Sequence, residues 1–187
     1  MFIQTEDTPN PDTLKFMPGT IVLNKGTADF SNSDSANDSP LASRLFTIDG
    51  VSRVFLASDF ISVTKQSELD WNVLKPSILT GIMEHFSSGL PFLNKSEEDN
   101  TEYTNSEDNE TIKQIKDLLE TRVRPAVAMD GGDIRLKSYK DGVAEVLLKG
   151  ACAGCPSSTV TLKHGVERMI KHYVPEVNSV EAFNINE

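Results

Sequence analysis

The sequence predicts an α+β protein made of two small α+β domains that are joined by a flexible acidic linker. Runs with the two-residue alternation of strands and runs with the three- and four-residue spacing of helices occur in both halves of the chain. Between them, residues 94–110 carry seven acidic side chains, one lysine, one aromatic residue and no aliphatic residue. Such a segment cannot bury enough apolar surface to fold. We therefore assign residues 1–93 to a first domain, 94–110 to the linker and 111–187 to a second domain.

The first domain begins with two predicted strands, over residues 2–4 and 13–17. Thr8-Pro9-Asn10-Pro11 separates them, because two prolines fix the backbone in an extended turn. Residues 31–39 are almost wholly Ser, Asn, Asp and Ala, which predicts a mobile loop.

The rest of the first domain alternates between helical and strand-like patterns. Ser39-Pro40 is typical of a helix start, a capping hydroxyl followed by proline. Residues 51–57 and 60–64 predict an antiparallel hairpin, and residues 70–86 a helix that contains Pro76. We find no catalytic constellation in this half of the sequence.

The second domain reads as helix, strand, strand, helix, strand. The first helix is expected from about Asp108 to Arg124-Pro125, followed by a turn at Asp130-Gly131-Gly132-Asp133. Two strands joined by a hairpin turn, a helix and a last strand complete the α-β-β-α-β order, over residues 134–139, 143–148, 157–173 and 179–185.

The chemistry is expected in Gly150-Ala151-Cys152-Ala153-Gly154-Cys155-Pro156, which holds both cysteines of the chain. The small residues between Cys152 and Cys155 let both sulfur atoms point at one centre. Ser157 or Ser158 is expected to cap the following helix, so that Cys155 lies just outside the helix N-terminus. The positive end of the helix dipole favours thiolate over thiol there.

Counting ligands favours a site shared by two chains. Iron–sulfur clusters usually need four thiolates, and structural zinc needs four Cys or His ligands. One chain offers Cys152 and Cys155, whereas two copies related by a two-fold axis offer four thiolates. Two other interpretations of the pair stay open: a thiol–disulfide oxidoreductase that uses the same dithiol, and a zinc-bridged structural dimer.

The histidines and the tryptophan are weaker candidates. His85 and His172 lie late in predicted helices and His164 about two turns after Cys155, and we expect all three at the surface. Trp71 is most simply an anchor in the core or at its edge.

Charge and hydropathy exclude several classes of partner. The net charge is −10, and residues 111–187 carry 11 basic and 10 acidic side chains, so no basic stripe suits nucleic acid. No apolar run is long enough to span a membrane. From the first residues of the sequence, we expect neither a signal peptide nor an Arg-rich transit peptide. These features predict a bacterial cytoplasmic protein, or a mitochondrial matrix protein if the chain is a processed form.

Several segments resemble a known family, the NifU-like (Nfu-type) iron–sulfur cluster proteins. The second domain resembles their C-terminal domain, in Val123-Arg124-Pro125, Asp130-Gly131-Gly132-Asp133 and Gly150 to Pro156 with Ser157-Ser158-Thr159 after it. The first domain resembles the Nfu N-terminal domain, in Thr8-Pro9-Asn10-Pro11, Leu14-Lys15-Phe16, Ser39-Pro40-Leu41-Ala42 and Asp59 to Lys65.

The resemblance implies a carrier or scaffold that is not an enzyme. Such a protein binds a 4Fe–4S cluster between two subunits, as a homodimer, and delivers it to apo-proteins. The family's ligands map onto Cys152 and Cys155. Because this chain lacks the cysteine-rich scaffold domain of the fuller NifU protein, the resemblance also implies a separate upstream scaffold.

Overall fold

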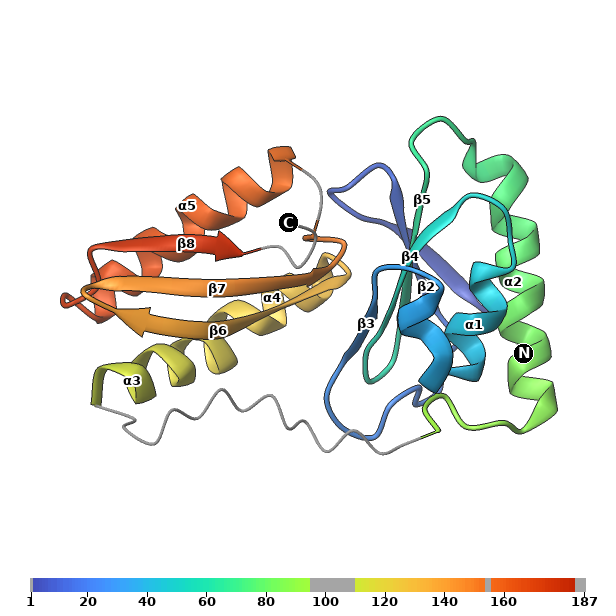
Figure 1. Ribbon diagram of the computed structural model, residues 1–187, viewed down its shortest axis with the longest axis horizontal. Coiled ribbons are helices and arrows are strands. Elements are labelled where there is room, and N and C mark those ends of the chain that lie inside the picture. Colours follow the sequence, from blue (N-terminus) through green and yellow to red (C-terminus); the bar gives the residue numbers. More distant parts are fainter. Residues whose placement is uncertain (1, 95–109, 154–155, 184–187) are drawn as a thin grey trace. The chain divides into compact units, whose positions relative to one another are not determined.

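The computed structural model describes residues 2–94, 110–153 and 156–183 (Figure 1). The chain separates into two compact units, residues 1–98 and 99–187. Each unit combines a sheet with helices, so the predicted α+β class is confirmed. The predicted linker lies almost wholly outside the described residues, and the domain boundaries therefore stay a prediction.

The first unit is built on an antiparallel sheet with the strand order β1-β2-β5-β4-β3. The predicted hairpin is confirmed, whereas the first strand begins two residues later than predicted. The strand β3 was not predicted, because three residues are too few to show an alternation. The strands are β1 (Gln4–Asp7), β2 (Thr13–Met17), β3 (Ala28–Phe30), β4 (Val51–Leu56) and β5 (Ile61–Lys65).

Two helices, α1 (Pro40–Phe46) and α2 (Trp71–Ser88), cover one face of this sheet. The hydroxyl of Ser39 accepts a hydrogen bond from the Ala42 amide at 3.1 Å, which confirms the predicted cap. The buried residues of α1 and α2 pack on alternate residues of the strands. This packing stabilises α2 as a continuous helix, although Pro76 lies inside it and lacks an amide donor. The core of the first unit includes Phe16, Leu41, Leu45, Val54, Ile61, Val63, Ile78 and Ile82.

The prediction of a mobile loop over residues 31–39 is wrong. A 3₁₀ turn, η1 (Asp34–Asp38), forms there, and Ala36 is fully buried in the core. The hydroxyl of Ser43 donates to the Ala36 carbonyl oxygen at 2.7 Å. The buried Ala36 packs this otherwise polar segment against the core, and composition alone does not reveal such a contact.

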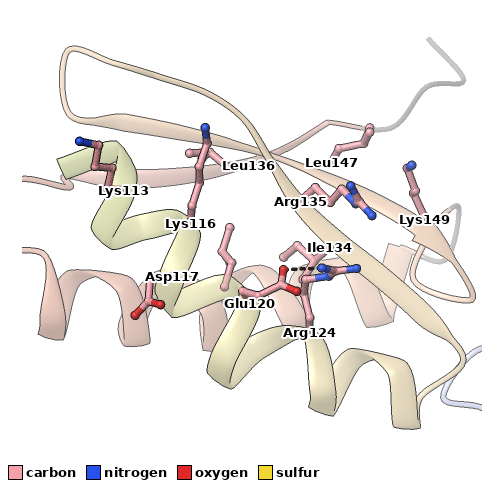
Figure 2. Close-up of a pocket in the computed structure, with 11 residues that line it drawn as sticks. Lys113, Lys116, Asp117, Glu120, Arg124, Ile134, Arg135, Leu136, Leu147 and Lys149 are labelled. Atoms are coloured by element: carbon pink, nitrogen blue, oxygen red, sulfur yellow. Dashed lines mark hydrogen bonds and ion pairs between the residues drawn. The ribbon is translucent and has the colours of Figure 1, made fainter. Parts of the chain in front are cut away.

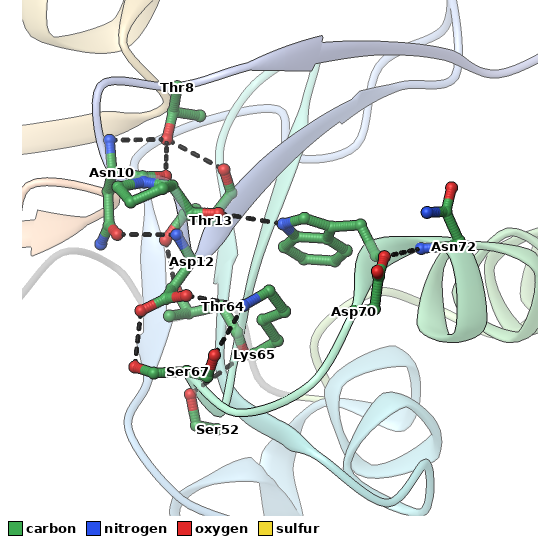
Figure 3. A network of polar contacts seen from close by, with 12 residues as sticks. Thr8, Asn10, Asp12, Thr13, Ser52, Thr64, Lys65, Ser67, Asp70 and Asn72 are labelled. Atoms are coloured by element: carbon green, nitrogen blue, oxygen red, sulfur yellow. Dashed lines mark hydrogen bonds and ion pairs between the residues drawn. The ribbon is translucent and has the colours of Figure 1, made fainter.

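The loop after β1 is held by a polar network (Figure 3). The Asp12 amide donates to the Asn10 side-chain oxygen at 3.0 Å, and Lys65 donates to the Asp12 carboxylate at 2.6 Å. Hydrogen bonds from Lys65 and Ser67 lower the pKa of Asp12. The indole of Trp71 donates to the Pro11 carbonyl at 3.0 Å, so Trp71 is an anchor at the edge of the core, as predicted.

A correction concerns His85, which is not at the surface. Its side chain is 1% exposed, and its ring lies 4.8 Å from that of Phe92. Neither ring nitrogen has a hydrogen-bond partner within the described part of the chain. Burial, and to a smaller degree the charge of Arg44, lowers the pKa of His85.

The second unit follows the predicted α-β-β-α-β order. β6 and β7 pair antiparallel, β7 and β8 pair parallel, and the helices share one core on a single face of the sheet. Its elements are α3 (Glu110–Leu118), η2 (Leu119–Val123), α4 (Arg124–Met129), β6 (Gly132–Lys140), β7 (Val143–Gly150), α5 (Pro156–Tyr173) and β8 (Ser179–Phe183).

The first helix of this unit does not end at Arg124-Pro125, as the sequence had suggested. A π-helical turn, η2, intervenes, and the chain continues as α4. Pro125 then lies in the first turn of α4. A proline near a helix start needs no amide donor, so it is tolerated there. No helix in the described residues is long and apolar enough to cross a membrane.

Candidate functional site

The cysteine segment begins where β7 ends and leads into α5. Since β7 and β8 are parallel, β7, α5 and β8 form a crossover unit, and the segment leaves the carboxyl end of β7. Ligand sites of sheets with parallel strands commonly lie outside those ends. The sequence predicted strand, loop and helix here but not the parallel pairing. Cys155 and Gly154 lie outside the described residues, so the geometry below is that of Cys152.

Cys152 is held in a tight turn against the core. Its side chain is 5% exposed and belongs to the core of the second unit. The amide of Ala153 donates to the Gly150 carbonyl at 3.1 Å, which closes the turn. Gly150 takes a φ of 63°, a left-handed conformation that glycine adopts without strain.

The motif Asp130-Gly131-Gly132-Asp133 forms the neighbouring wall of this site. The Ala151 amide donates to the Gly131 carbonyl at 3.1 Å. A Cβ atom placed on Gly132 would lie 2.7 Å from the sulfur of Cys152 and 2.7 Å from the backbone oxygen of Lys149. The sequence predicted a turn at this motif, which is correct, but not that the missing side chain makes room for the thiol.

An ion pair links this wall to α4. The buried carboxylate of Asp133, 4% exposed, accepts a hydrogen bond from Nε of Arg124 at 2.7 Å, and Arg124 also pairs with Glu120. Burial alone would lower the pKa of Arg124, but the bonds to Asp133 and Glu120 outweigh it and raise that pKa. The ion pair thus joins the Val123-Arg124-Pro125 segment to the glycine motif. The sequence does not reveal this contact, because the two segments are separated along the chain.

The helix after the cysteines starts earlier than predicted. α5 begins at Pro156, so Ser157 and Ser158 lie inside the helix and do not precede it, and the predicted capping role is wrong. Proline fits the first position of a helix because its φ is already helical. Cys155 thus directly precedes the first helical residue.

The other histidines behave as predicted. His164 and His172 are exposed on α5. Among the described residues, no three His, Cys, Asp or Glu side chains gather as they would around a metal ion.

Comparison with known proteins agrees with this architecture. Residues 3–89 match the family model "Scaffold protein Nfu/NifU N terminal", and residues 115–181 match the "NifU-like domain". A human protein named NFU1 iron-sulfur cluster scaffold homolog, mitochondrial, is 51% identical over 97% of this chain and 71% of its own. The chain belongs to the Nfu-type family of iron–sulfur cluster scaffold proteins.

Two further matches were found. The protein of the same name from Drosophila sechellia is 50% identical over 97% of this chain, which spans 64% of the length of that relative. The solution structure of a NifU-like protein from Saccharomyces cerevisiae aligns with 51% of this chain and 86% of its own, with a TM-score of 0.46 and 26% identity.

Proposed function

We propose that this protein is a carrier that binds a 4Fe–4S cluster through Cys152 and Cys155 and transfers it to apo-proteins. The observation that carries the proposal is the placement of the only two thiols of the chain at the carboxyl end of β7, directly before α5. Thiolates are the ligands that iron–sulfur clusters require. The partial positive charge of a helix N-terminus offsets the negative charge of a thiolate-ligated cluster.

The cluster is proposed to bridge two copies of the chain. Each copy supplies two thiolates and a 4Fe–4S cluster takes four, so cluster binding and homodimer formation are coupled. A cluster held at the surface between subunits can be surrendered by ligand exchange to incoming thiolates. This property suits a carrier better than a permanent redox centre.

Loading is proposed to turn Cys152 outward. Its sulfur lies beside Gly132 in the core, and a thiol that is 5% exposed cannot ligate a cluster shared with a second chain.

The surroundings of the carrier are proposed from its family. Residues 111–187 bind the cluster, residues 94–110 connect the two domains, and residues 1–93 contact partner proteins. A separate scaffold loads the cluster, and apo iron–sulfur proteins receive it. Relatives that share about half of the residues are named mitochondrial, which favours the mitochondrial matrix over a bacterial cytoplasm.

Anaerobic reconstitution with iron and sulfide tests the proposal. The full chain, Cys152→Ala and Cys155→Ala are compared by visible and Mössbauer spectroscopy and by iron and sulfide content. The loaded chain is then mixed with a purified apo-enzyme whose activity requires a 4Fe–4S cluster. We expect a 4Fe–4S spectrum for the full chain alone, and recovery of enzyme activity as that spectrum disappears.

Two results would refute the proposal in different ways. A colourless protein whose dithiol cycles to a disulfide with a thiol substrate would support the oxidoreductase. A colourless dimer that keeps zinc under chelation would support the structural zinc site.

A further inference from the structure

A groove in the second unit plays no part in the cysteine site described above (Figure 2). It lies between the helical segment α3-η2-α4 and the strands β6 and β7, with a volume of about 490 Å³. This volume is within the range of ligand sites in proteins, roughly 300–1,000 Å³. The groove is therefore large enough to bind a partner group.

Basic side chains dominate the rim of the groove. They come from both sides, from the helical segment and from the two strands, and are Lys113, Lys116, Arg124, Arg135 and Lys149. Two acidic side chains, Asp117 and Glu120, also line the groove.

The two acidic side chains do not neutralise the rim. Glu120 pairs with Arg124, and the buried Asp133 pairs with both Arg124 and Arg135. Neither Lys113 nor Lys149 has an ion-pair partner within the described residues, and they lie at opposite ends of the groove (Figure 2). The groove thus keeps an excess of positive charge, which is notable in a chain with a net charge of −10.

The floor of the groove is apolar. Leu136 is half-buried and presents apolar surface to the groove, whereas the other apolar lining residues, Leu119, Ile134 and Leu147, are buried. An apolar floor with a charged rim binds a ligand that combines an apolar group with carboxylates.

The rim is too long for one small anion. Lys113 and Arg124 are separated by eleven residues of continuous helical chain, which corresponds to about 16 Å along the axis at 1.5 Å per residue. An extended peptide covers the same length with about five residues at 3.3 Å each. The spacing of the cations therefore matches a peptide better than a single small anion.

We propose that this groove binds an acidic peptide segment of a partner protein, with one large apolar side chain seated on the floor. Lys149 is three residues before Cys152 on the strand that leads into the cysteine loop. A partner bound here is therefore held beside that loop. That the partner is a donor or recipient of clusters rests on the proposed function. Binding of the acidic peptide to the groove requires no cluster.

The test measures peptide binding to the full-length apo-protein. The probe is a fluorescein-labelled heptapeptide with a central phenylalanine and three glutamates on each side, followed by fluorescence anisotropy at two salt concentrations. We expect saturable binding that weakens about tenfold or more in the double variant Lys113→Glu, Lys149→Glu. The double variant Lys140→Glu, Arg168→Glu reverses two exposed charges, at the far end of β6 and on α5, and thus changes the net charge by the same amount. It is the matched control and should bind almost normally.

Two additional arms separate the contributions. Replacing the phenylalanine of the probe by alanine should weaken binding several-fold if the apolar floor is used. A variant in which the acidic residues 97–108 are changed to serine or asparagine shows whether that segment competes for the groove.

The outcomes are distinct. Equal loss in the control, Lys140→Glu, Arg168→Glu, and in Lys113→Glu, Lys149→Glu would show nonspecific charge attraction and overturn the proposal. Binding that occurs only after neutralisation of residues 97–108 would assign the groove to the chain's own acidic segment and also overturn it. Neither result depends on cluster loading, so the proposed function would stand or fall separately.

Discussion

At the scale of single residues, Gly132 is the position where the smallest change should have the largest effect. The Gly132→Ala methyl group would lie 2.7 Å from the Cys152 sulfur and 2.7 Å from a backbone oxygen. Because the backbone cannot yield easily, we expect Gly132→Ala to displace the thiol from its buried position, to destabilise the second unit by about 1–3 kcal/mol and to make Cys152 of the apo-protein react faster with a disulfide reagent. Thermal unfolding by circular dichroism and the rate of thiol modification, both in a Cys155→Ala background, measure the two effects.

Gly165 provides the matched control for this change. A Cβ at Gly165 in α5 meets nothing within 4 Å, so Gly165→Ala should leave the reactivity of the Cys152 thiol unchanged. It should also raise stability by about 0.5–1 kcal/mol, because alanine favours the helix. Equal thiol reactivity in both variants would show that Gly132 does not make room for the thiol.

His85 should make the first unit sensitive to acid. The pKa of this buried histidine is lowered in the folded state, so the unfolded chain binds the extra proton first as the pH falls. The free energy of unfolding should therefore be highest above pH 6.5 and decrease below it, by at most about 1.4 kcal/mol per pH unit. Urea unfolding followed by the fluorescence of Trp71, the single tryptophan of the chain, reports on this unit.

Two variants isolate this effect. His85→Leu should remove most of the decrease between pH 7 and pH 5, whereas His172→Leu, at an exposed position, should retain it. An unchanged slope in His85→Leu would assign the acid sensitivity to other groups.

At the scale of elements, a single carboxylate on α5 adds a hydrogen bond to the last strand, which also pairs with β7. The Val180 amide on β8 donates to Glu167 on α5 at 3.0 Å, and Lys171 pairs with the same carboxylate at 2.9 Å. These two bonds, that of Val180 first, lower the pKa of Glu167. We expect Glu167→Ala to cost about 1–2 kcal/mol and to speed amide hydrogen exchange along β8.

Glu181 is the matched control for β8, because its carboxylate is exposed on the same strand. Glu181→Ala should leave exchange at Val180 unchanged. Similar exchange in both variants would contradict an anchoring role for Glu167.

The ion pair between α4 and β6 should be more costly to break. Arg124→Ala leaves the buried Asp133 without the partner that bonds it at 2.7 Å, whereas Arg122→Ala removes an exposed arginine from the neighbouring turn. Arg135 still pairs with this carboxylate at 3.3 Å, so we expect a loss of about 1–3 kcal/mol in the first variant and less than about 1 kcal/mol in the second. Chemical unfolding followed by circular dichroism measures this difference, and equal losses would contradict the role of the pair.

The sequence predicted most elements because their patterns are local. The alternation of Thr13–Met17, the capping pair Ser39-Pro40 and the row of Leu74, Ile78 and Ile82 each lie within a few residues. Features that depend on distant contacts were missed. The burial of His85 and the approach of Gly132 to Cys152 arise only when separate segments pack, and no local pattern encodes them.

At the scale of the whole molecule, the two units have different proposed roles. If residues 111–187 contain the entire cluster site, this fragment alone should load the same amount of cluster per chain as the full protein. Iron and sulfide analysis of both preparations measures this. Failure of a folded fragment to load would show that the first unit contributes to the site.

The central claim is that one cluster is shared by two chains. Native mass spectrometry of the anaerobically reconstituted full chain measures the number of chains, iron atoms and sulfides in the same particle. The account predicts two chains with one 4Fe–4S cluster, and single chains for Cys152→Ala at the same concentration. A cluster bound by a single chain, or an iron-free chain that is unchanged by reconstitution, would contradict it.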